Sequence, residues 1–295
     1  MQINWYPGHM ARAKRLLQQQ AGRVDAVIEV CDARLPYSSR NPDLNRIISG
    51  KQHLLLLNKS DLADPELSRQ WLTCFRKKGI RCAAVSADKN LREVLGLIEK
   101  MTCGKVERSA ARGMKRTVRV MVAGVPNVGK STLINRLHGA SIVQVADRPG
   151  VTRANQWVRV GQYLELLDTP GLLWPRLDDA AAAKRLAYIS AIRDEVVDTY
   201  ALACSLMEEL KVLAPEMVSR RFHLEDMELK GQAMIEAVCI GRGFLLRGGE
   251  PDLDRACRTI LDEFRDGKLG RITLESPVKE EKCSGCPEEV IANGE

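Results

Sequence analysis

The chain has 295 residues, enough for one large domain or two ordinary domains that each bury a core. It is 45% hydrophobic and 28% charged, as expected of a soluble globular protein, and no apolar run approaches the ~18 residues of a membrane span. The first residues lack the charged and then apolar pattern of a signal peptide, so we expect a cytoplasmic protein without a membrane partner.

The net charge of +7 is distributed unevenly along the chain. Residues 1–180 hold 29 Lys and Arg against 16 Asp and Glu, a net charge of +13, whereas residues 181–295 have a net charge of −6. The basic half favours a polyanionic partner, and RNA rather than DNA. Its densest part, Lys100 to Arg119, has seven basic residues and Glu107, which fits either a solvated linker or a binding stripe.

The nine cysteines do not form a spaced framework, so we expect most of them to be reduced core residues. Cys283 and Cys286 form one C-x-x-C pair. That pair could be half of a zinc site, a redox pair, or part of a polar tail without a metal.

Buried strands, each followed by polar residues, are predicted in the first hundred residues. The predicted elements are a helix at 10–21, strands at 24–31, 54–57 and 82–85, and a helix at 91–101. The carboxyl ends of parallel strands meet at one edge of a sheet, where ligands collect. We therefore expect the polar residues after these strands to share a site.

A strand at 117–123, a glycine-rich turn at 124–129 and a helix at 131–137 follow, and then a hairpin of strands at 157–160 and 163–167. Beyond residue 178 the spacing of apolar residues is helical; between Pro251 and Gly267 it follows one helix face. The sequence therefore predicts a first domain at 1–178, a helical domain at 179–275 and a disordered tail at 276–295.

Gly124 to Ser131 match the phosphate-loop pattern G-x-x-x-x-G-K-[ST], in the strand, turn and helix context that such a loop requires. Backbone N–H groups of the loop would face the phosphates, Lys130 would reach them, and Ser131 would bind Mg²⁺. The nucleotide-binding residues predicted here are Asn127, Val128, Gly129, Lys130, Ser131 and Thr132.

Asp168 to Gly171 follow the second strand of the hairpin and match D-x-x-G. Asp168 would hold Mg²⁺, and the Gly171 N–H would contact the γ-phosphate. Thr152 is the candidate threonine of the first switch, which would also contact Mg²⁺.

Asn58 to Asp61 match N-K-x-D, the pattern that selects guanine. The Asp61 carboxylate would accept hydrogen bonds from N1–H and N2–H₂ of the base, while Asn58 braces the site and the Lys59 stem covers the ring. Ser86 and Ala87 would support the guanine O6 atom. Alone, this pattern is also that of a common turn.

The guanine pattern precedes the phosphate loop, which is the reverse of the order in ordinary small GTPases. We therefore predict an α/β, circularly permuted P-loop GTPase domain, with a mostly parallel sheet covered by helices on both faces, followed by a C-terminal all-α domain. Because termini can move to surface loops at little cost in packing, the site survives the permutation.

The motif order, the opening residues Asn4 to Met10, the stretch Asp32 to Pro36 and the closing Gly267 to Arg271 together resemble the ribosome biogenesis GTPase A family. The resemblance implies a GTP- and Mg²⁺-dependent factor for assembly of the large ribosomal subunit that contacts its rRNA. The glutamine that follows D-x-x-G in Ras-type GTPases is replaced by Leu172 and Leu173, and the resemblance assigns the positioning of water to His9.

The resemblance extends to a possible K⁺ ion, which Asn127 would hold beside the phosphates as the asparagine of potassium-dependent GTPases does, although Asn127 could equally be a turn residue. Two other functions remain open from the sequence. One is a GTP-controlled RNA-binding module with incidental turnover, which the missing glutamine favours; the other is a permuted GTPase that serves the small subunit.

Overall fold

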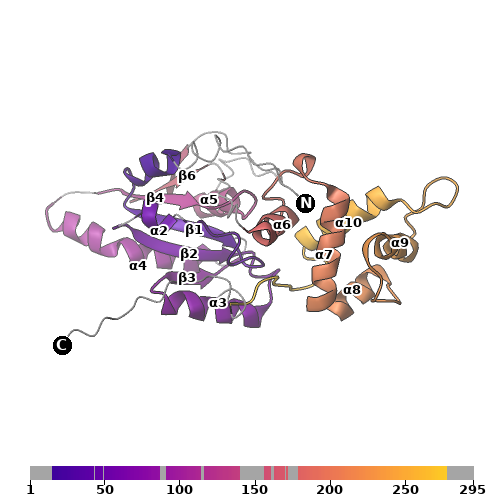
Figure 1. The fold of residues 1–295 in the computed structure, drawn as a ribbon. Helices are drawn as coiled ribbons and strands as arrows, with labels where there is room; N and C mark the ends of the chain where they lie inside the picture. Colours follow the sequence, from indigo (N-terminus) through magenta and orange to yellow (C-terminus); the bar gives the residue numbers. More distant parts are fainter. Residues whose placement is uncertain are drawn as a thin grey trace, which may run out of the picture.

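The computed structural model describes residues 15–42, 44–48, 50–86, 91–113, 116–139, 156–160, 163–169, 171 and 179–277. Figure 1 shows an elongated molecule with the sheet and its covering helices at one end and helices of the later chain at the other. Within the described ranges, no helix combines the length and the apolar character needed to span a membrane.

A six-stranded sheet in the order β3-β2-β1-β4-β6-β5 forms the first part of the molecule. All neighbouring strands are parallel except β5 and β6, which pair as an antiparallel hairpin. The strands are β1 (Ala26–Asp32), β2 (Gln52–Asn58), β3 (Arg81–Ala84), β4 (Val118–Ala123), β5 (Gln156–Val160) and β6 (Leu164–Asp168). The central strand β1 is buried along its whole length; most of its residues are apolar, and its two carboxylates, Glu29 and Asp32, pair with Arg40 and Arg34.

Helices cover both faces of the sheet, as the sequence predicts. On one face, α4 (Leu91–Ala110) and α5 (Lys130–His138) pack on alternate residues such as Ile28 and Leu56. On the other face, α3 (Pro65–Lys77) and the helical residues 15–21 pack on the intervening residues. A short helix, α2 (Leu44–Ile47), joins this second face.

The later chain is helical, as predicted. It comprises α6 (Ala180–Tyr188), a 3₁₀ turn η1 (Asp194–Val196), α7 (Thr199–Leu213), α8 (Pro215–Phe222), α9 (Gly231–Arg242) and α10 (Leu253–Arg265). Aspartates cap several of these helices; the Asp198 carboxylate, for example, accepts a hydrogen bond from the Ala201 N–H at the start of α7. We call residues 179–265 the helical region.

One predicted boundary is wrong. The helix expected to end at Met101 continues to Ala110, so half of the basic run expected as a linker is the end of α4. Lys, Glu, Arg and Ala are good helix formers, and Val106 still packs against the core. The helix therefore continues beyond Met101, where the regular spacing of apolar residues ends.

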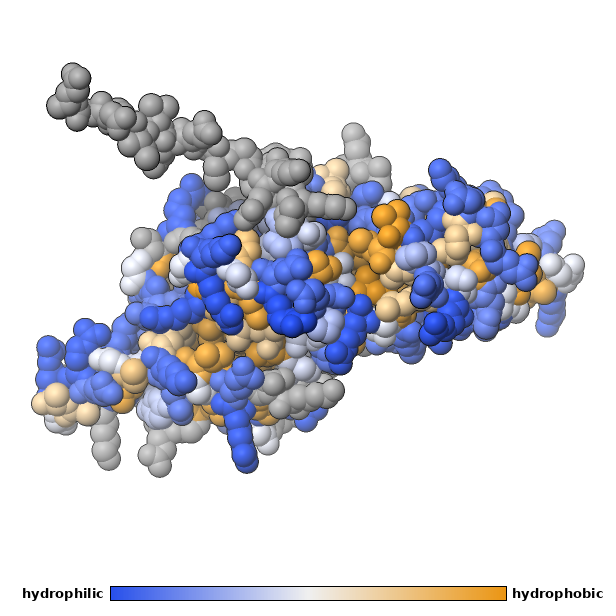
Figure 2. Space-filling view, turned by 90° about the horizontal axis from the view of Figure 1, so that it is seen from below, coloured by the Kyte–Doolittle hydropathy of each residue, from blue (hydrophilic) through white to orange (hydrophobic). Residues whose placement is uncertain are grey.

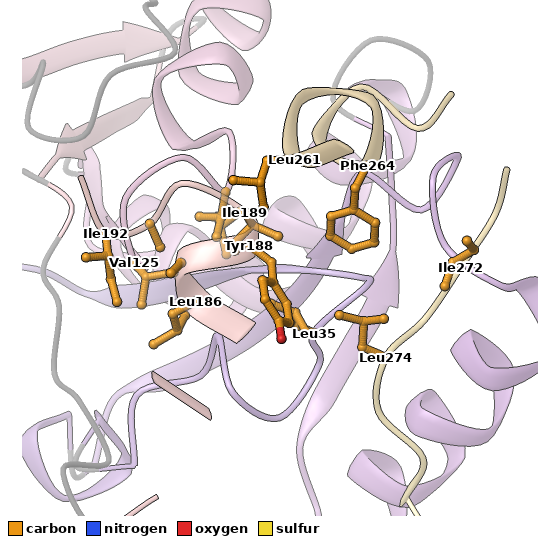
Figure 3. Close-up of a cluster of buried hydrophobic side chains, with 14 of the residues drawn as sticks. Leu35, Val125, Leu186, Tyr188, Ile189, Ile192, Leu261, Phe264, Ile272 and Leu274 are labelled. Atoms are coloured by element: carbon orange, nitrogen blue, oxygen red, sulfur yellow. The ribbon is translucent and has the colours of Figure 1, made fainter. Parts of the chain in front are cut away.

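The chain returns to the sheet after α10. Residues 267–275, which we call the return segment, form no helix and bury Leu269, Ile272 and Leu274. Figure 3 shows Ile272 and Leu274 beside Phe264 of α10, Tyr188 of α6 and Leu35 of the loop after β1. One apolar core, which also includes Val125 and Leu186, therefore joins the helical region to the sheet.

Candidate nucleotide site

Four predicted motifs lie at the carboxyl edge of the sheet. β1 ends at Asp32, β2 at Asn58 and β6 at Asp168, and Gly124 follows the last residue of β4. β2 and β4 pair in parallel with the two sides of β1, so the loop after β2 and the loop after β4 lie on either side of the end of β1. The two motifs in these loops are 66 residues apart in the chain. Reversed order in the sequence thus becomes proximity in the fold.

The phosphate loop packs too closely for side chains at its two glycines. A Cβ at Gly124 would collide with the Val30 carbonyl oxygen of β1, and a Cβ at Gly129 would collide with Nδ2 of Asn58. Gly129 also has a φ of +90°, which L residues rarely adopt. Its conformation turns the chain directly into α5, and the amino end of that helix faces the loop.

A hydrogen bond joins the two halves of the predicted site. The side-chain Nδ2 of Asn58, which is buried, donates to the backbone oxygen of Val128 over 2.7 Å. Asn58 belongs to the guanine motif and Val128 to the phosphate loop. The predicted bracing role of Asn58 thus corresponds to a specific contact that fixes one motif against the other.

The loop after β2 is shaped around Lys59. This residue has a φ of +58°, and its Nζ lies 3.6 Å from Oδ2 of Asp32. Burial alone would raise the pKa of the Asp32 carboxyl, but Arg34 and Lys59 outweigh it and bring the pKa to about 2. Asp32 therefore remains charged and holds the Lys59 stem at the edge of the site.

The two predicted base-contacting loops lie side by side. The Ser60 N–H donates to the Val85 carbonyl over 3.1 Å, which places Asp61, half-exposed, near the buried Ser86. Ala87, the other predicted residue of this loop, lies outside the described residues.

Lys130 begins α5 and is buried against the phosphate loop. Its Nζ donates a 2.8 Å hydrogen bond to the Val125 carbonyl. Burial lowers the pKa of the Lys130 amine from 10.5 to about 8, while the nearby charge of Asp168 acts in the opposite direction. A buried cation beside a helix amino end provides a strong attraction for phosphate.

Nucleotide affinity should therefore depend on pH. Phosphate charges raise the pKa of a neighbouring amine, so binding takes up a proton above the pKa of about 8 that Lys130 has without nucleotide. The affinity for GDP is expected to be nearly constant below that pKa and to fall roughly tenfold from pH 7 to pH 9. Titration of a fluorescent GDP analogue measures it. Lys130→Met should bind weakly at every pH, and a flat profile for the parent protein would contradict the role of this amine.

Oxygen ligands of the kind that Mg²⁺ prefers meet beside Lys130. The Ser131 hydroxyl donates to Oδ2 of Asp168 over 3.0 Å, and the Asp168 side chain is buried. A hydroxyl and a carboxylate at one point suit a small, hard cation. Thr152, the third predicted ligand, lies outside the described residues.

Thr132 and Gly171 complete the described part of the phosphate end. Thr132 follows Ser131 in the first turn of α5 and is half-buried. Gly171 lies so close to Pro126 of the phosphate loop that a Cβ would contact its backbone at 2.7 Å. Glycine is thus required where the D-x-x-G motif meets the loop.

Asn127 connects the phosphate loop to the helical region. Its Nδ2 donates a 2.9 Å hydrogen bond to the carbonyl of Ser190, just after α6, and its own φ is +61°. The amide oxygen is the part of this side chain that could bind a cation such as K⁺. The geometry thus gives Asn127 a structural contact that the sequence did not indicate.

His9, Leu172 and Leu173 lie outside the described residues, so the predicted positioning of water is not visible. The predicted tail is also outside them, apart from Ser276 and Pro277, so its disorder and the C-x-x-C pair remain predictions.

Arg34 is a central residue that sequence reasoning did not assign. Its guanidinium donates to both carboxylate oxygens of Asp32, at 2.9 Å and 2.8 Å, and to the carbonyls of Phe264 and Arg265 at the end of α10. It also lies over the Phe264 ring, 5.0 Å from the centroid. Arg34 thus links the Asp32–Lys59 pair to the helical region.

The return segment contacts the loop that carries the guanine motif. The Ile272 N–H donates to the Leu62 carbonyl, and the Asp64 N–H donates to the Thr273 hydroxyl. The Leu274 N–H donates to the Arg34 carbonyl. The Gly267 to Arg271 stretch contributed to the family resemblance, but its sequence did not indicate where the return segment packs.

Comparisons with known proteins agree with this geometry. A family model described as "50S ribosome-binding GTPase" matches residues 119–230. The chain is 40% identical over 280 residues to ribosome biogenesis GTPase A of Bacillus cereus, which covers 94% of this chain and 95% of that protein.

Two solved structures of YlqF from Thermotoga maritima are similar. The GDP-bound structure has a TM-score of 0.67 at 26% identity and covers 90% of this chain and all of that one. The GNP-bound structure has a TM-score of 0.63 at 28% identity and covers 90% of this chain and 98% of that one. The chain therefore belongs to the ribosome biogenesis GTPase A family and is a circularly permuted GTPase.

Proposed function

We propose that this GTPase is an assembly factor of the large ribosomal subunit, which binds the rRNA of the immature subunit in the GTP state and leaves on hydrolysis. The observation that carries its dependence on GTP is the Asn58–Val128 hydrogen bond, which joins the guanine motif and the phosphate loop in one site. The family description and the relatives' names support a ribosomal partner, and we propose the cytoplasm as the place where the two meet.

The nucleotide roles follow from the positions of the side chains. Asp61 and Lys59 would bind guanine with Ser86 and Ala87, and the loop from Asn127 to Thr132 would hold the phosphates, with Gly171 beside the γ-phosphate. Ser131, Thr152 and Asp168 would hold Mg²⁺, and Asn127 would hold K⁺. When bound, these cations supply positive charge that offsets the charge on the phosphate oxygens.

Contacts on both sides of the site would carry its state to the helical region. At the phosphate end, Asn127 binds the Ser190 carbonyl; at the guanine end, Arg34 binds the last carbonyls of α10. Nucleotide-dependent changes at Gly171 and Thr152 would thus bias the orientation of the helical region. That orientation would control binding to the subunit. We propose that the second domain has the bounds 179–275 and so includes both the helical region and the return segment.

Stimulated turnover tests this function and the role of His9. We expect slow GTP hydrolysis by the protein alone and faster hydrolysis with immature large subunits. His9→Ala should reduce the stimulated rate about 100-fold, the range of a lost water-positioning or proton-transfer group, while GTP affinity changes little. Phosphate release at saturating GTP measures the rate.

The control for this variant is His223→Asn. His223 is exposed in a left-handed turn (φ +55°) after α8, a backbone that asparagine tolerates, so the rate should not change. A His9→Ala protein as fast as the parent would refute the role of His9. Turnover that large subunits fail to stimulate would instead favour a GTP-controlled RNA-binding module, and stimulation by small subunits alone would favour the other ribosomal partner.

A further inference from the structure

A basic pocket lies at the edge of the sheet opposite the nucleotide site. It has a volume of about 190 Å³ and is lined by Lys105, Arg108, Ser109, Arg112 and Arg116. Arg116 precedes the first residue of β4, whereas the phosphate loop follows its last residue, so the length of the strand, roughly 20 Å, separates the two sites.

The end of α4 and the turn after it bring these cations together. Lys105 and Arg108 are three residues apart in α4, which places them on one side of the helix, and Arg112 lies in the turn that follows Ala110. Glu107, the acidic residue of this stretch, is two residues from Lys105 and does not face the same direction. Figure 2 shows hydrophilic residues, with some apolar ones between them, at the end of the molecule where α4 lies in Figure 1, as over much of this face.

The Asp25 carboxylate pairs with two cations of the pocket. Asp25 accepts hydrogen bonds from Lys105 Nζ at 3.3 Å, Arg116 at 2.7 Å and the Arg119 N–H at 3.1 Å. Burial raises the pKa of the Asp25 carboxyl, but these donors outweigh it and leave the pKa below its usual value. Asp25 therefore stays charged and fixes Lys105 and Arg116 in place.

Arg108 and Arg112 add positive charge to the pocket from exposed positions. Both are exposed, and Arg108 Nε donates to the Gly104 carbonyl at 2.7 Å, which orients its guanidinium. Among the described residues, the four cations of the pocket and the Asp25 carboxylate give a net charge of +3. Like charges held together disfavour the folded chain unless an anion binds among them.

We propose that this pocket binds phosphate groups of the large subunit's rRNA, as a second contact distant from the helical region; this rests on the proposed function. Guanidinium groups form paired hydrogen bonds to phosphate oxygens, and three of the four cations are arginines. The pocket also belongs to the basic half of the chain. With the helical region at the other end, two linked contacts would bind far more tightly than either alone.

Salt-dependent RNA binding tests the pocket directly. The variant is Arg108→Gln with Arg112→Gln, which removes two charges and keeps the Asp25 pairs. The control is Lys77→Gln with Lys78→Gln, which removes two exposed charges at the end of α3, on the other face of the sheet. The probe is a fluorescent RNA hairpin of mixed sequence, titrated with the GDP-bound protein in about 50 to 300 mM KCl.

The two lost phosphate contacts should reduce the slope of log affinity against log salt by roughly 1.5 and weaken binding at the lowest salt about tenfold. The control should bind like the parent, and both variants should keep the parent's GDP affinity. Equal loss in both variants, no loss in either, or weaker binding with an unchanged slope would each overturn the proposal.

Binding to large ribosomal subunits separates the remaining outcomes. A pocket variant that binds the hairpin normally but loses the subunit would point to an acidic protein and overturn RNA as the partner. If the parent binds the hairpin through the pocket but shows no nucleotide-dependent binding to large subunits, the proposed function fails while the pocket stands.

Discussion

Replacing Arg34 with methionine is expected to lower the free energy of unfolding by about 3–5 kcal/mol, because it leaves the buried Asp32 carboxylate without its main partner. Arg34 is almost fully buried and provides four of the hydrogen bonds that hold this region together. Lys59, 3.6 Å from Asp32 and part of the nucleotide site, cannot replace the paired contacts of the guanidinium.

The loss should extend to the helical region. Without the Arg34 guanidinium, the carbonyls of Phe264 and Arg265 lose a charged donor at the end of α10, from which the return segment leads back to the sheet. The Leu274 N–H keeps its hydrogen bond to the backbone carbonyl of residue 34. Urea unfolding followed by tryptophan fluorescence measures the change, since the Trp71 indole donates to the Glu275 carbonyl of the return segment. Hydrogen exchange should rise first at residues 262–275.

Arg69→Met is the matched control. Arg69 is exposed on α3 and pairs with Glu66 one turn earlier, a contact that contributes little in water. Its stability should stay within about 0.5 kcal/mol of the parent. An Arg34→Met protein as stable as this control would show that the Asp32–Arg34 pair does not join the two parts of the molecule.

The second large effect is expected at Asp61. An amide there would place an N–H₂ group near donors of guanine, so Asp61→Asn should lose at least about 100-fold in GTP affinity, the loss of two hydrogen bonds to a charged group. Xanthine has a carbonyl where guanine has its amino group, and that carbonyl would accept from the new amide. Displacement of a bound fluorescent nucleotide by GTP or by xanthosine triphosphate measures the affinity for each and therefore the change of preference from guanine to xanthine.

Asp64→Asn provides the same chemical change three residues later. Asp64 caps α3 by accepting a hydrogen bond from the Leu67 N–H, and asparagine caps helices equally well. This variant should prefer guanine as strongly as the parent does. An Asp61→Asn protein that kept its preference for guanine over xanthine would refute the assignment of Asp61.

Much of the sheet could be predicted because its signals are local. Short apolar runs such as Leu54 to Leu57 are typical of buried strands, and the glycines of the phosphate loop mark a turn in which the close neighbours of Gly124 and Gly129 leave no room for a side chain. The predicted strands differ from the observed ones by at most two residues at their ends. The permuted order followed from the motifs alone, because parallel strands bring their carboxyl ends together.

The contacts between the two parts of the molecule could not be predicted in this way. Arg34 is charged and would be expected at the surface, yet it binds carbonyls about 230 positions later in the chain. The return segment has no periodic pattern, and backbone hydrogen bonds to Leu62 and Arg34 fix its position. Such long-range contacts depend on the whole fold, so they cannot be predicted from the spacing of residues that are close in the sequence.

Co-sedimentation with immature large ribosomal subunits, in GDP or in a non-hydrolysable GTP analogue and at two salt concentrations, measures the proposed function most directly. We predict that the protein pellets with the subunits only in the analogue, and that the higher salt concentration weakens this binding because rRNA phosphates contribute to it. Equal binding in both nucleotides, or no binding in either, would contradict a GTP-controlled assembly factor.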